Sequence, residues 1–205
     1  MDKIITISRE FGSGGKEVGK RLSDELEMAY YDEEIITKLA KETGMSEEYI
    51  KNISEKGIYP QSFNFGRTFA RFGVLQSNQT EILVKQQEII KKIAEKGNCI
   101  IVGRGADVIL RDYNTLNIFV YSDMESKINR CRIKAPENEN LSEKELEKKI
   151  VQVDKNRKKF HELISNLEWG DKRNYHLCIN TAGLEIKEVI PALSEYIREW
   201  FRRKI

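Results

Sequence analysis

The architecture follows from residues 8–17, which run Ser-Arg-Glu-Phe-Gly-Ser-Gly-Gly-Lys-Glu. They come after a short β-branched run at residues 3–8 and before a helical stretch that extends to about Met28. Glycine lets backbone amides approach an anion closely, and successive amides form a concave nest for phosphate oxygens. The positive end of the following helix adds to this attraction. A strand, a glycine-rich turn, a lysine and a helix in this order predict a phosphate-binding loop.

The loop predicts a binding site for a nucleoside triphosphate. We expect Lys16 to reach the β- and γ-phosphates. The residues expected to bind ATP are Gly12, Ser13, Gly14, Gly15, Lys16 and Glu17. Glu10 replaces the first glycine of the consensus loop, and Glu17 replaces the serine or threonine that normally binds Mg²⁺. Mg²⁺ is therefore expected to be held through phosphates and waters. The alternative interpretation is a glycine-rich turn with a structural role.

The composition is that of a globular protein and argues against several functional classes. The 205 residues suit a single domain, residues 1–205. The net charge of +2 comes from interleaved acids and bases, whereas nucleic-acid-binding proteins usually carry a clustered basic face. No apolar run approaches the ~20 residues that a membrane span needs. Cys99, Cys131 and Cys178 lack zinc-ligand spacing, so we expect a cytoplasmic protein with reduced cysteines, the first and last of them buried.

Strand-like and helix-like segments alternate along the chain. Short apolar runs predict strands at residues 3–8, 29–32, 99–102, 117–121 and 177–179. Helical spacing predicts helices at residues 33–43, about 46–56, about 81–97, 142 to about 167, and over the last part of the chain. This alternation predicts an α/β fold with about five parallel strands and helices on both faces, the three-layer sandwich of P-loop NTPases, with a helical lid and acceptor region.

Three segments depart from this regular pattern. Residues 57–77 combine glycines, a proline and several aromatic residues, and we expect them to be irregular. The aromatic and basic run at residues 63–72 allows two interpretations: stacking of a ligand ring, or a small hydrophobic cluster. Residues 134–145 are the most polar stretch and are expected to form a lid. Pro191 lies inside the last helical pattern, so that helix either starts near Glu188 or is kinked.

Two further groups of residues point to phosphate chemistry. Arg104 follows the buried strand expected at residues 99–102. Because ligands bind beyond the carboxyl ends of strands in open α/β sheets, we expect Arg104 to face the same crevice as Lys16. A guanidinium there suits a phosphate, although a local cap or ion pair is the alternative. Asp154 and Arg157 lie three residues apart and share a helix face, where a plain surface ion pair is the alternative.

These motifs resemble the cytidylate kinase-like branch of the nucleoside monophosphate kinases. The resemblance is carried by the Gly-Gly-Lys loop, by the Ile-Val-Gly-Arg sequence that ends at Arg104, and by the Asp-x-Asn-Arg sequence that ends at Arg157. It extends through residues 4–15, 31–36 and 174–181, and so covers nearly the whole chain.

The resemblance implies an architecture and a role for individual residues. It implies a core, an acceptor-binding insertion at about residues 33–80, and a lid at about residues 132–160 that closes over ATP. The residues implied around the transferring group are Lys16, Arg104, Arg130 and Arg157. Those implied in acceptor binding are Asp32, Lys38, Arg104, Asp154 and Arg157.

Two positions depart from the family in ways that bear on the acceptor. The family carries an aspartate that recognises the cytosine edge directly after Gly-Arg, whereas this chain has Gly105. Glu33 stands at the position of an acceptor-side serine. Because a glycine offers no side chain to the base, we expect CMP to be poorly distinguished from UMP or dCMP.

The sequence therefore predicts an ATP-dependent phosphotransferase that acts on small-molecule nucleotides, with CMP or dCMP as the best acceptor. Two alternatives stay open. One is a P-loop kinase for another small acceptor, and the other is a regulatory nucleotide-binding protein, which Glu17 favours. His161 and His176 are expected to be packing or surface residues away from the phosphate loop.

Overall fold

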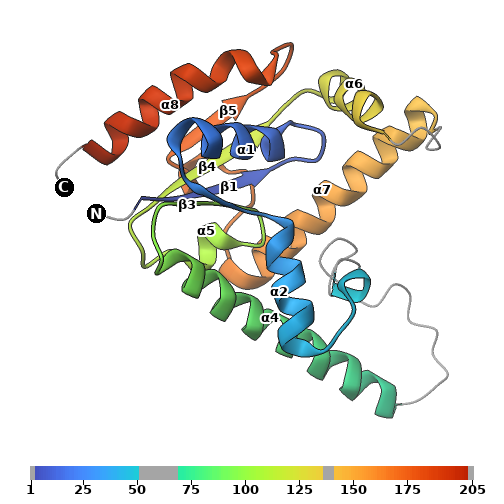
Figure 1. Cartoon of the computed structure of the whole chain (residues 1–205). Helices are drawn as coiled ribbons and strands as arrows, with labels where there is room; N and C mark the ends of the chain where they lie inside the picture. The colour runs from blue at the N-terminus through green and yellow to red at the C-terminus, as the bar shows by residue number, and fades with distance from the viewer. Residues whose placement is uncertain (1–2, 51–68, 136–140, 203–205) are drawn as a thin grey trace.

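The structure is a computed structural model that describes residues 3–50, 69–135 and 141–202. A five-stranded sheet lies at its centre, with β1 in the middle of the order β2-β3-β1-β4-β5 (Figure 1). Every neighbouring pair of strands is parallel. The strands are β1 (Ile4–Arg9), β2 (Ala29–Tyr31), β3 (Cys99–Val102), β4 (Thr115–Tyr121) and β5 (Leu177–Asn180). The predicted parallel sheet of about five strands is confirmed.

Helices cover both faces of the sheet, as predicted. One face carries α1 (Gly15–Leu26) and α8 (Ile186–Arg202), which pack against each other. The other face carries α2 (Glu33–Thr43), α4 (Phe69–Ala94) and the short α5 (Ala106–Ile109) (Figure 1). Beyond the carboxyl end of β1 lie α6 (Met124–Lys134) and α7 (Glu143–Ser165), and a 3₁₀ turn, η1 (Lys172–Asn174), precedes β5.

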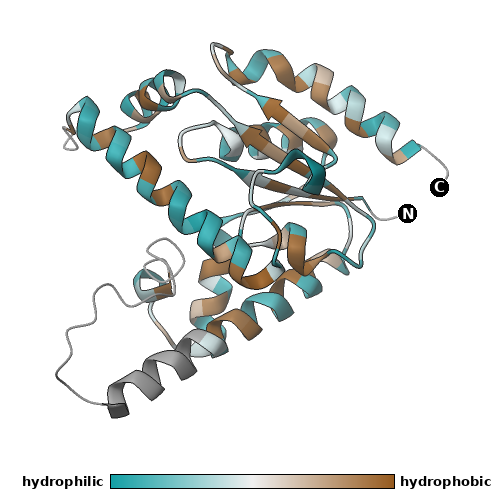
Figure 2. Cartoon of the chain, turned by 180° about the vertical axis from the view of Figure 1, so that it is seen from behind, coloured by the Kyte–Doolittle hydropathy of each residue, from teal (hydrophilic) through white to brown (hydrophobic). Residues whose placement is uncertain are grey.

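The core is divided by the sheet into two apolar layers. Successive residues of a strand point to opposite faces, so Ile4 and Ile101 pack under α2 and α4, whereas Ile5 and Ile100 pack under α1 and α8. Much of the sheet is therefore brown in Figure 2, while α7 is mostly hydrophilic. Burial on both faces explains why β3 is a continuous apolar run without alternation.

Several predicted boundaries need correction. α4 begins at Phe69, so residues 69–77, which were expected to be irregular, belong to a helix. α8 starts at Ile186 and continues through Pro191, whose missing amide proton removes one hydrogen bond from the first two turns. The sequence analysis did not predict α6, because its mean hydropathy is low and its few apolar residues do not form a clear helix face.

The structure tests some of the remaining local predictions, while others fall on residues that it does not describe. α7 begins within one residue of its predicted start, where Ser142 and Glu145 form a capping box. Cys99 is fully buried, but Cys178 is only partly buried. The rest of the irregular segment, at residues 57–68, the second half of the helix expected at about residues 46–56, and the middle of the expected lid, at residues 136–140, lie outside the described residues. No helix within the described ranges is long and apolar enough to span a membrane.

Candidate active site

The glycine-rich loop forms a tight turn whose shape depends on missing side chains. Gly14 has a φ of +82° and directly precedes α1, and Gly12 has a φ of +77°. A Cβ on Gly14 would lie 2.7 Å from Cδ1 of Ile186, so the loop packs directly on α8. The hydroxyl of the buried Ser13 donates to the Glu10 carbonyl (2.8 Å), which closes the turn. No side chain caps the start of α1, which leaves its first amides available to an anion.

A cavity of about 710 Å³ lies over this loop, and its lining has more basic than acidic residues. Its lining includes all the residues predicted to bind ATP except Ser13, whose side chain is buried inside the loop. The basic residues around it are Arg9, Lys16, Lys20, Arg21, Arg130, Lys134, Lys149 and Arg157. The size, charge and exposed helix amides suit a polyphosphate.

Lys16 points into solvent at the edge of this cavity, with 59% of its side chain exposed. Its Nζ lies 2.7 Å from Oε1 of Glu33 and 3.2 Å from Oδ2 of Asp32. Partial burial opposes the charge, but the hydrogen bonds to these two carboxylates outweigh it and raise the lysine pKa. Lys16 therefore stays protonated at neutral pH, and Asp32 and Glu33 compete with phosphate for it.

Glu17, at the position that normally binds Mg²⁺, is engaged with cations. Its carboxylate pairs with Nζ of Lys134 at 2.6 Å and with Nε of Arg21 at 2.9 Å. Burial would raise its pKa, but the hydrogen bonds from Lys134 and Arg21 lower it overall. Among the described residues, no group of three or more His, Cys, Asp or Glu could hold a metal ion. These residues fit a Mg²⁺ ion carried by the nucleotide phosphates better than a site made of protein ligands.

A buried ionic network ties the loop to α6 and α7. Nζ of Lys127, whose side chain is 7% exposed, lies 2.7 Å from Oε2 of Glu10 and 3.1 Å from Oδ2 of Asp154. Asp154 also accepts a hydrogen bond from the Phe11 amide at 2.7 Å. Burial raises the Asp154 pKa despite these partners. Glu10, the first departure from the consensus loop, is thus the loop's anchor on α6.

The other predicted arginines also contact the ends of strands. Nη1 of Arg157 donates to the carbonyl of Arg9 at 2.9 Å and lies 3.9 Å from Oδ1 of Asp154. The predicted shared face is confirmed, but this pair is attached to the loop and is not a plain surface ion pair. Arg130 donates to the Ser122 hydroxyl and to the backbone carbonyls of Thr181 and Leu184, which holds it at the rim of the cavity over the loop.

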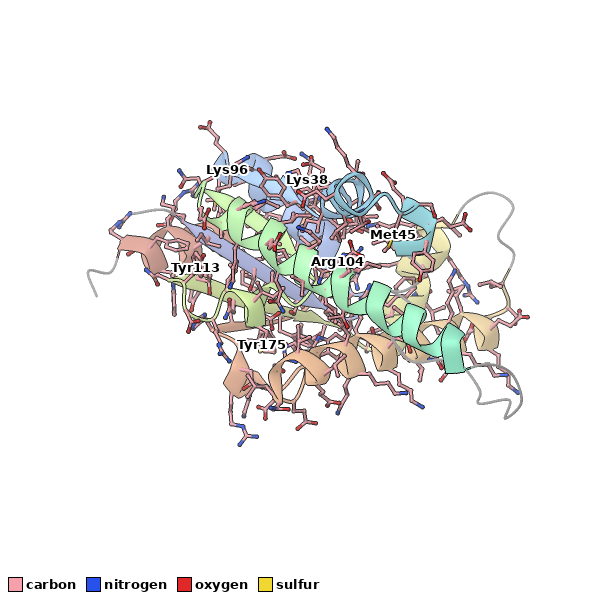
Figure 3. All side chains as sticks on the ribbon, turned by 90° about the horizontal axis from the view of Figure 1, so that it is seen from below. Lys38, Met45, Lys96, Arg104, Tyr113 and Tyr175 are labelled. Atoms are coloured by element: carbon pink, nitrogen blue, oxygen red, sulfur yellow. The ribbon has the colours of Figure 1, made fainter. Side chains whose placement is uncertain are left out.

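A second, smaller cavity lies on the other side of the β1 end. Its lining includes Arg104, which follows β3 and takes a φ of +60° while its carbonyl accepts a hydrogen bond from Gln86 of α4 (3.0 Å). Figure 3 shows Arg104 between α4 and the sheet. The cavity is lined by Ser8, Arg9, Gln86, Gly103, Arg104, Gly105, Asp107, Val153, Arg157, Phe160, His161 and Trp169.

The burial of His161 agrees with its expected packing role, but the sequence analysis did not anticipate its pairing with Asp107. His161 is buried on α7, and its Nε2 lies 2.8 Å from Oδ2 of Asp107 on α5. Both residues line the second cavity together with Arg104. His176, in contrast, lies at the amino end of β5, where its Nδ1 accepts the Asn117 amide (2.9 Å) away from the phosphate loop, as predicted.

The remaining acceptor-side candidates occupy different positions. Asp32 is buried at the end of β2, between Lys16 and Arg9. Lys38 lies on α2 with its Nζ 4.9 Å from the centroid of the Tyr31 ring (Figure 3), and it is not among the described residues that line either cavity. The structure thus brings Lys16, Arg130 and Arg157 to one cavity and leaves Lys38 apart. Arg104 was expected to face the same crevice as Lys16, but it lines the second cavity, which Lys16 does not.

Comparison with known proteins places these features in a family. The sequence profile of the cytidylate kinase-like family matches residues 4–183. An uncharacterized protein from Eubacterium ventriosum shares the fold with a TM-score of 0.69 at 28% identity, over 96% of this chain and 98% of that one. A search of curated proteins found no match.

Two shikimate kinases share the fold at lower identity. The enzyme from Bacteroides thetaiotaomicron has a TM-score of 0.59 at 15% identity, over 97% of this chain and 99% of its own. The enzyme from Acinetobacter baumannii, solved in complex with shikimate, has a TM-score of 0.54 at 14% identity, over 99% of this chain and 96% of its own. These similarities identify the P-loop kinase fold.

Proposed function

Because the chain belongs to the cytidylate kinase-like family, we propose that it is an ATP-dependent phosphotransferase whose acceptor is a nucleoside monophosphate, with CMP or dCMP first. The observation that carries this proposal is the pair of cation-lined cavities at the carboxyl end of β1. One lies over the phosphate loop and the other includes Arg104, and Arg9 and Arg157 line both. Two anionic substrates bound in these cavities would meet beside those two arginines.

The proposed reaction needs positioning and charge neutralisation more than covalent help from the protein. The loop amides and Lys16 hold the β- and γ-phosphates of ATP. Arg104 and Arg157 hold the acceptor phosphate, and Arg130 stands at the rim of the ATP cavity. An oxygen of the acceptor phosphate is already anionic, so it attacks the γ-phosphorus without a general base. Mg²⁺, carried in on the ATP phosphates, would neutralise their charge.

A second candidate is a kinase whose acceptor group is a hydroxyl. The buried His161–Asp107 pair favours it, because His161 holds Oδ2 of Asp107 while Oδ1 has no hydrogen-bond partner among the described residues, and a carboxylate can take the proton that a hydroxyl must lose. This pair lines the same cavity as Arg104. A phosphate acceptor makes no use of such a base, so the two candidates require different groups of this cavity.

An acceptor panel tests both candidates. The purified protein is mixed with ATP, Mg²⁺ and either CMP, dCMP, UMP, AMP or a set of small hydroxylated acids and sugars, and ADP formation and the phosphorylated product are measured. We expect CMP and dCMP to be phosphorylated, with a preference over UMP in kcat/KM nearer ~10-fold than ~10⁴-fold, since Gly105 offers the base no polar side chain. Phosphorylation of a hydroxylated compound but of no nucleotide would establish the second candidate instead.

A further inference from the structure

Arg9, the last residue of β1, stands between the two cavities. It lines both of them, and 17% of its side chain is exposed. Its position at the carboxyl end of the central strand is the place where ligands meet in an open α/β sheet. The sequence analysis included Arg9 in the loop motif but gave it no role.

The path of the Arg9 side chain depends on two glycines. A Cβ on Gly15, the first residue of α1, would lie 2.5 Å from Cβ of Arg9. A Cβ on Gly103, just after β3, would lie 1.7 Å from Nη1 of Arg9. The guanidinium thus fills the space that a side chain at position 103 would need. The arginine runs from the phosphate loop to the segment that presents Arg104.

One buried carboxylate orients Arg9 together with Lys16. The Asp32 side chain is 6% exposed, with Oδ1 3.8 Å from Nη2 of Arg9 and Oδ2 3.2 Å from Nζ of Lys16. A carboxylate between two cations attracts both, so it fixes the lysine of the donor site and the arginine of the second cavity relative to each other. This arrangement places two positive groups along the route from one cavity to the other.

We propose that Arg9 is a catalytic residue that contacts the phosphoryl group while it moves from ATP to the acceptor. This inference rests on the proposed phosphotransferase function. An acceptor oxygen forms a bond to the γ-phosphorus, the bond from that phosphorus to the β,γ-bridging oxygen breaks, and ADP leaves with the electron pair. Arg9 exchanges no atoms and donates hydrogen bonds to the equatorial oxygens, where the charge spreads in the transition state.

A purely structural role makes different predictions. If Arg9 served only to neutralise Asp32, Arg9→Lys would retain most of the activity, because lysine keeps the charge. If the planar guanidinium contacts the phosphoryl group, lysine cannot replace its geometry. We expect Arg9→Lys and Arg9→Met to lower kcat by ~10²-fold or more, with KM for ATP and the affinity for ADP changed by less than ~3-fold. Added guanidinium should restore part of the turnover of Arg9→Ala.

Gly103→Ala tests the same inference without removing the arginine. The new methyl group displaces the guanidinium, so this variant should lose turnover as Arg9→Met does. Gly183→Ala is the matched control, because Gly183 has a similar φ (+65° against +73°) but no atom within 4 Å of an added Cβ. It carries the same backbone strain and should keep wild-type turnover. The double variant Arg9→Met/Gly103→Ala should lose no more turnover than the less active of the two single variants, because both changes act on the same guanidinium.

The outcomes separate this inference from the proposed function. Turnover of Arg9→Met within a few-fold of wild type, or full retention by Arg9→Lys, would overturn the role of Arg9 and leave the kinase proposal intact. If wild type binds and slowly hydrolyses ATP but phosphorylates no nucleotide, the proposed acceptor is wrong, and the same variants are compared by hydrolysis. If isothermal titration shows that wild type binds neither ADP nor ATP, both proposals fail.

Discussion

The phosphate loop and the second cavity are assembled in different ways. The loop is one continuous segment, residues 8–17, held between β1 and α1. The second cavity takes its residues from β1, from α4, from the segment after β3 and from α7. Loop geometry follows from local glycines, whereas the second cavity exists only when distant elements pack.

This difference also determines what stabilises each region. The loop is attached to α6 and α7 by Lys127, with its two carboxylate partners Glu10 and Asp154. The second cavity relies on the His161–Asp107 pair and on close packing around Gly105. A local motif can thus be recognised in the sequence while the contacts that hold it in place come from far along the chain.

The largest expected effect is on the attachment of the loop. Lys127→Met should lower the free energy of unfolding by about 3 kcal/mol, because it leaves two largely buried carboxylates without their shared cation. Chemical denaturation at neutral pH measures this loss. Lys158→Met is the matched control: Lys158 also faces two carboxylates, Glu162 and Glu168, but at the surface. The control should leave the free energy of unfolding almost unchanged, because exposed ion pairs contribute little, and equal losses in both variants would contradict the buried network.

The next largest effect is expected on turnover, with little change in the free energy of unfolding. Lys16→Ala should lower turnover by ~10²-fold or more, since it removes a charge aligned with the donor phosphates. The free energy of unfolding should change by less than ~0.5 kcal/mol, because the side chain is mostly exposed. Lys187→Ala, which removes another exposed lysine that pairs with a carboxylate, serves as the control. Wild-type turnover in Lys16→Ala would remove the loop from the proposed site.

The sequence predicted the sheet and the loop because both depend on local patterns. A continuous apolar run as short as residues 99–102 favours a strand buried on both faces, and the glycines next to Lys16 indicate a backbone path that few other residues allow. The resemblance to the family added the position of Arg130 and implied roles for Arg104 and Arg157. The structure places Arg130 at the cavity over the loop, Arg104 at the second cavity and Arg157 at both.

The sequence did not reveal the side-chain contacts between helices, strands and the phosphate loop. Lys127 appears in the sequence as one more lysine on a polar helix, and only the fold reveals that it is buried between Glu10 and Asp154. His161 was expected to be a packing or surface residue, and it is buried, but its pairing with Asp107, 54 residues away, could not be predicted from the sequence. The only sequence feature connected with Arg9 is a pair of glycines, Gly15 and Gly103, that leave room for its side chain. Because they lie far apart in the chain, only the fold shows that they flank the same arginine.

A substitution at Gly105 probes the second cavity. Gly105→Asp would introduce the carboxylate that reads cytosine in the family, but Gly105 has a φ of +65° and a Cβ there would lie 2.3 Å from Cδ1 of Ile164. We therefore expect a loss of about 1–2 kcal/mol in unfolding free energy from backbone strain and overpacking. Gly105→Ala carries the same strain without the charge, so the difference between the two variants in kcat/KM for CMP against UMP isolates the carboxylate. A fully stable Gly105→Asp variant would contradict the tight packing.

The smallest effect is expected at the opposite end of the sheet, away from both cavities. Burial lowers the His176 pKa below its usual 6.5, and Nδ1 must stay unprotonated to accept the Asn117 amide. As the pH falls below 6.5, the unfolded chain takes up a proton that the folded chain does not, so stability falls with pH. The ring is partly open to solvent, which limits the loss to about 0.5 kcal/mol, or a Tm shift of about 1–2 °C between about pH 7.5 and pH 5.5.

The control for this prediction is His176→Asn, which keeps an acceptor for the amide but does not titrate. Its Tm should fall less than that of wild type between about pH 7.5 and pH 5.5, whereas its affinity for ADP should be unchanged. An identical pH dependence in both proteins would show that other groups cause the acid loss, and a change in ADP affinity would show that this end of the sheet is coupled to the phosphate loop.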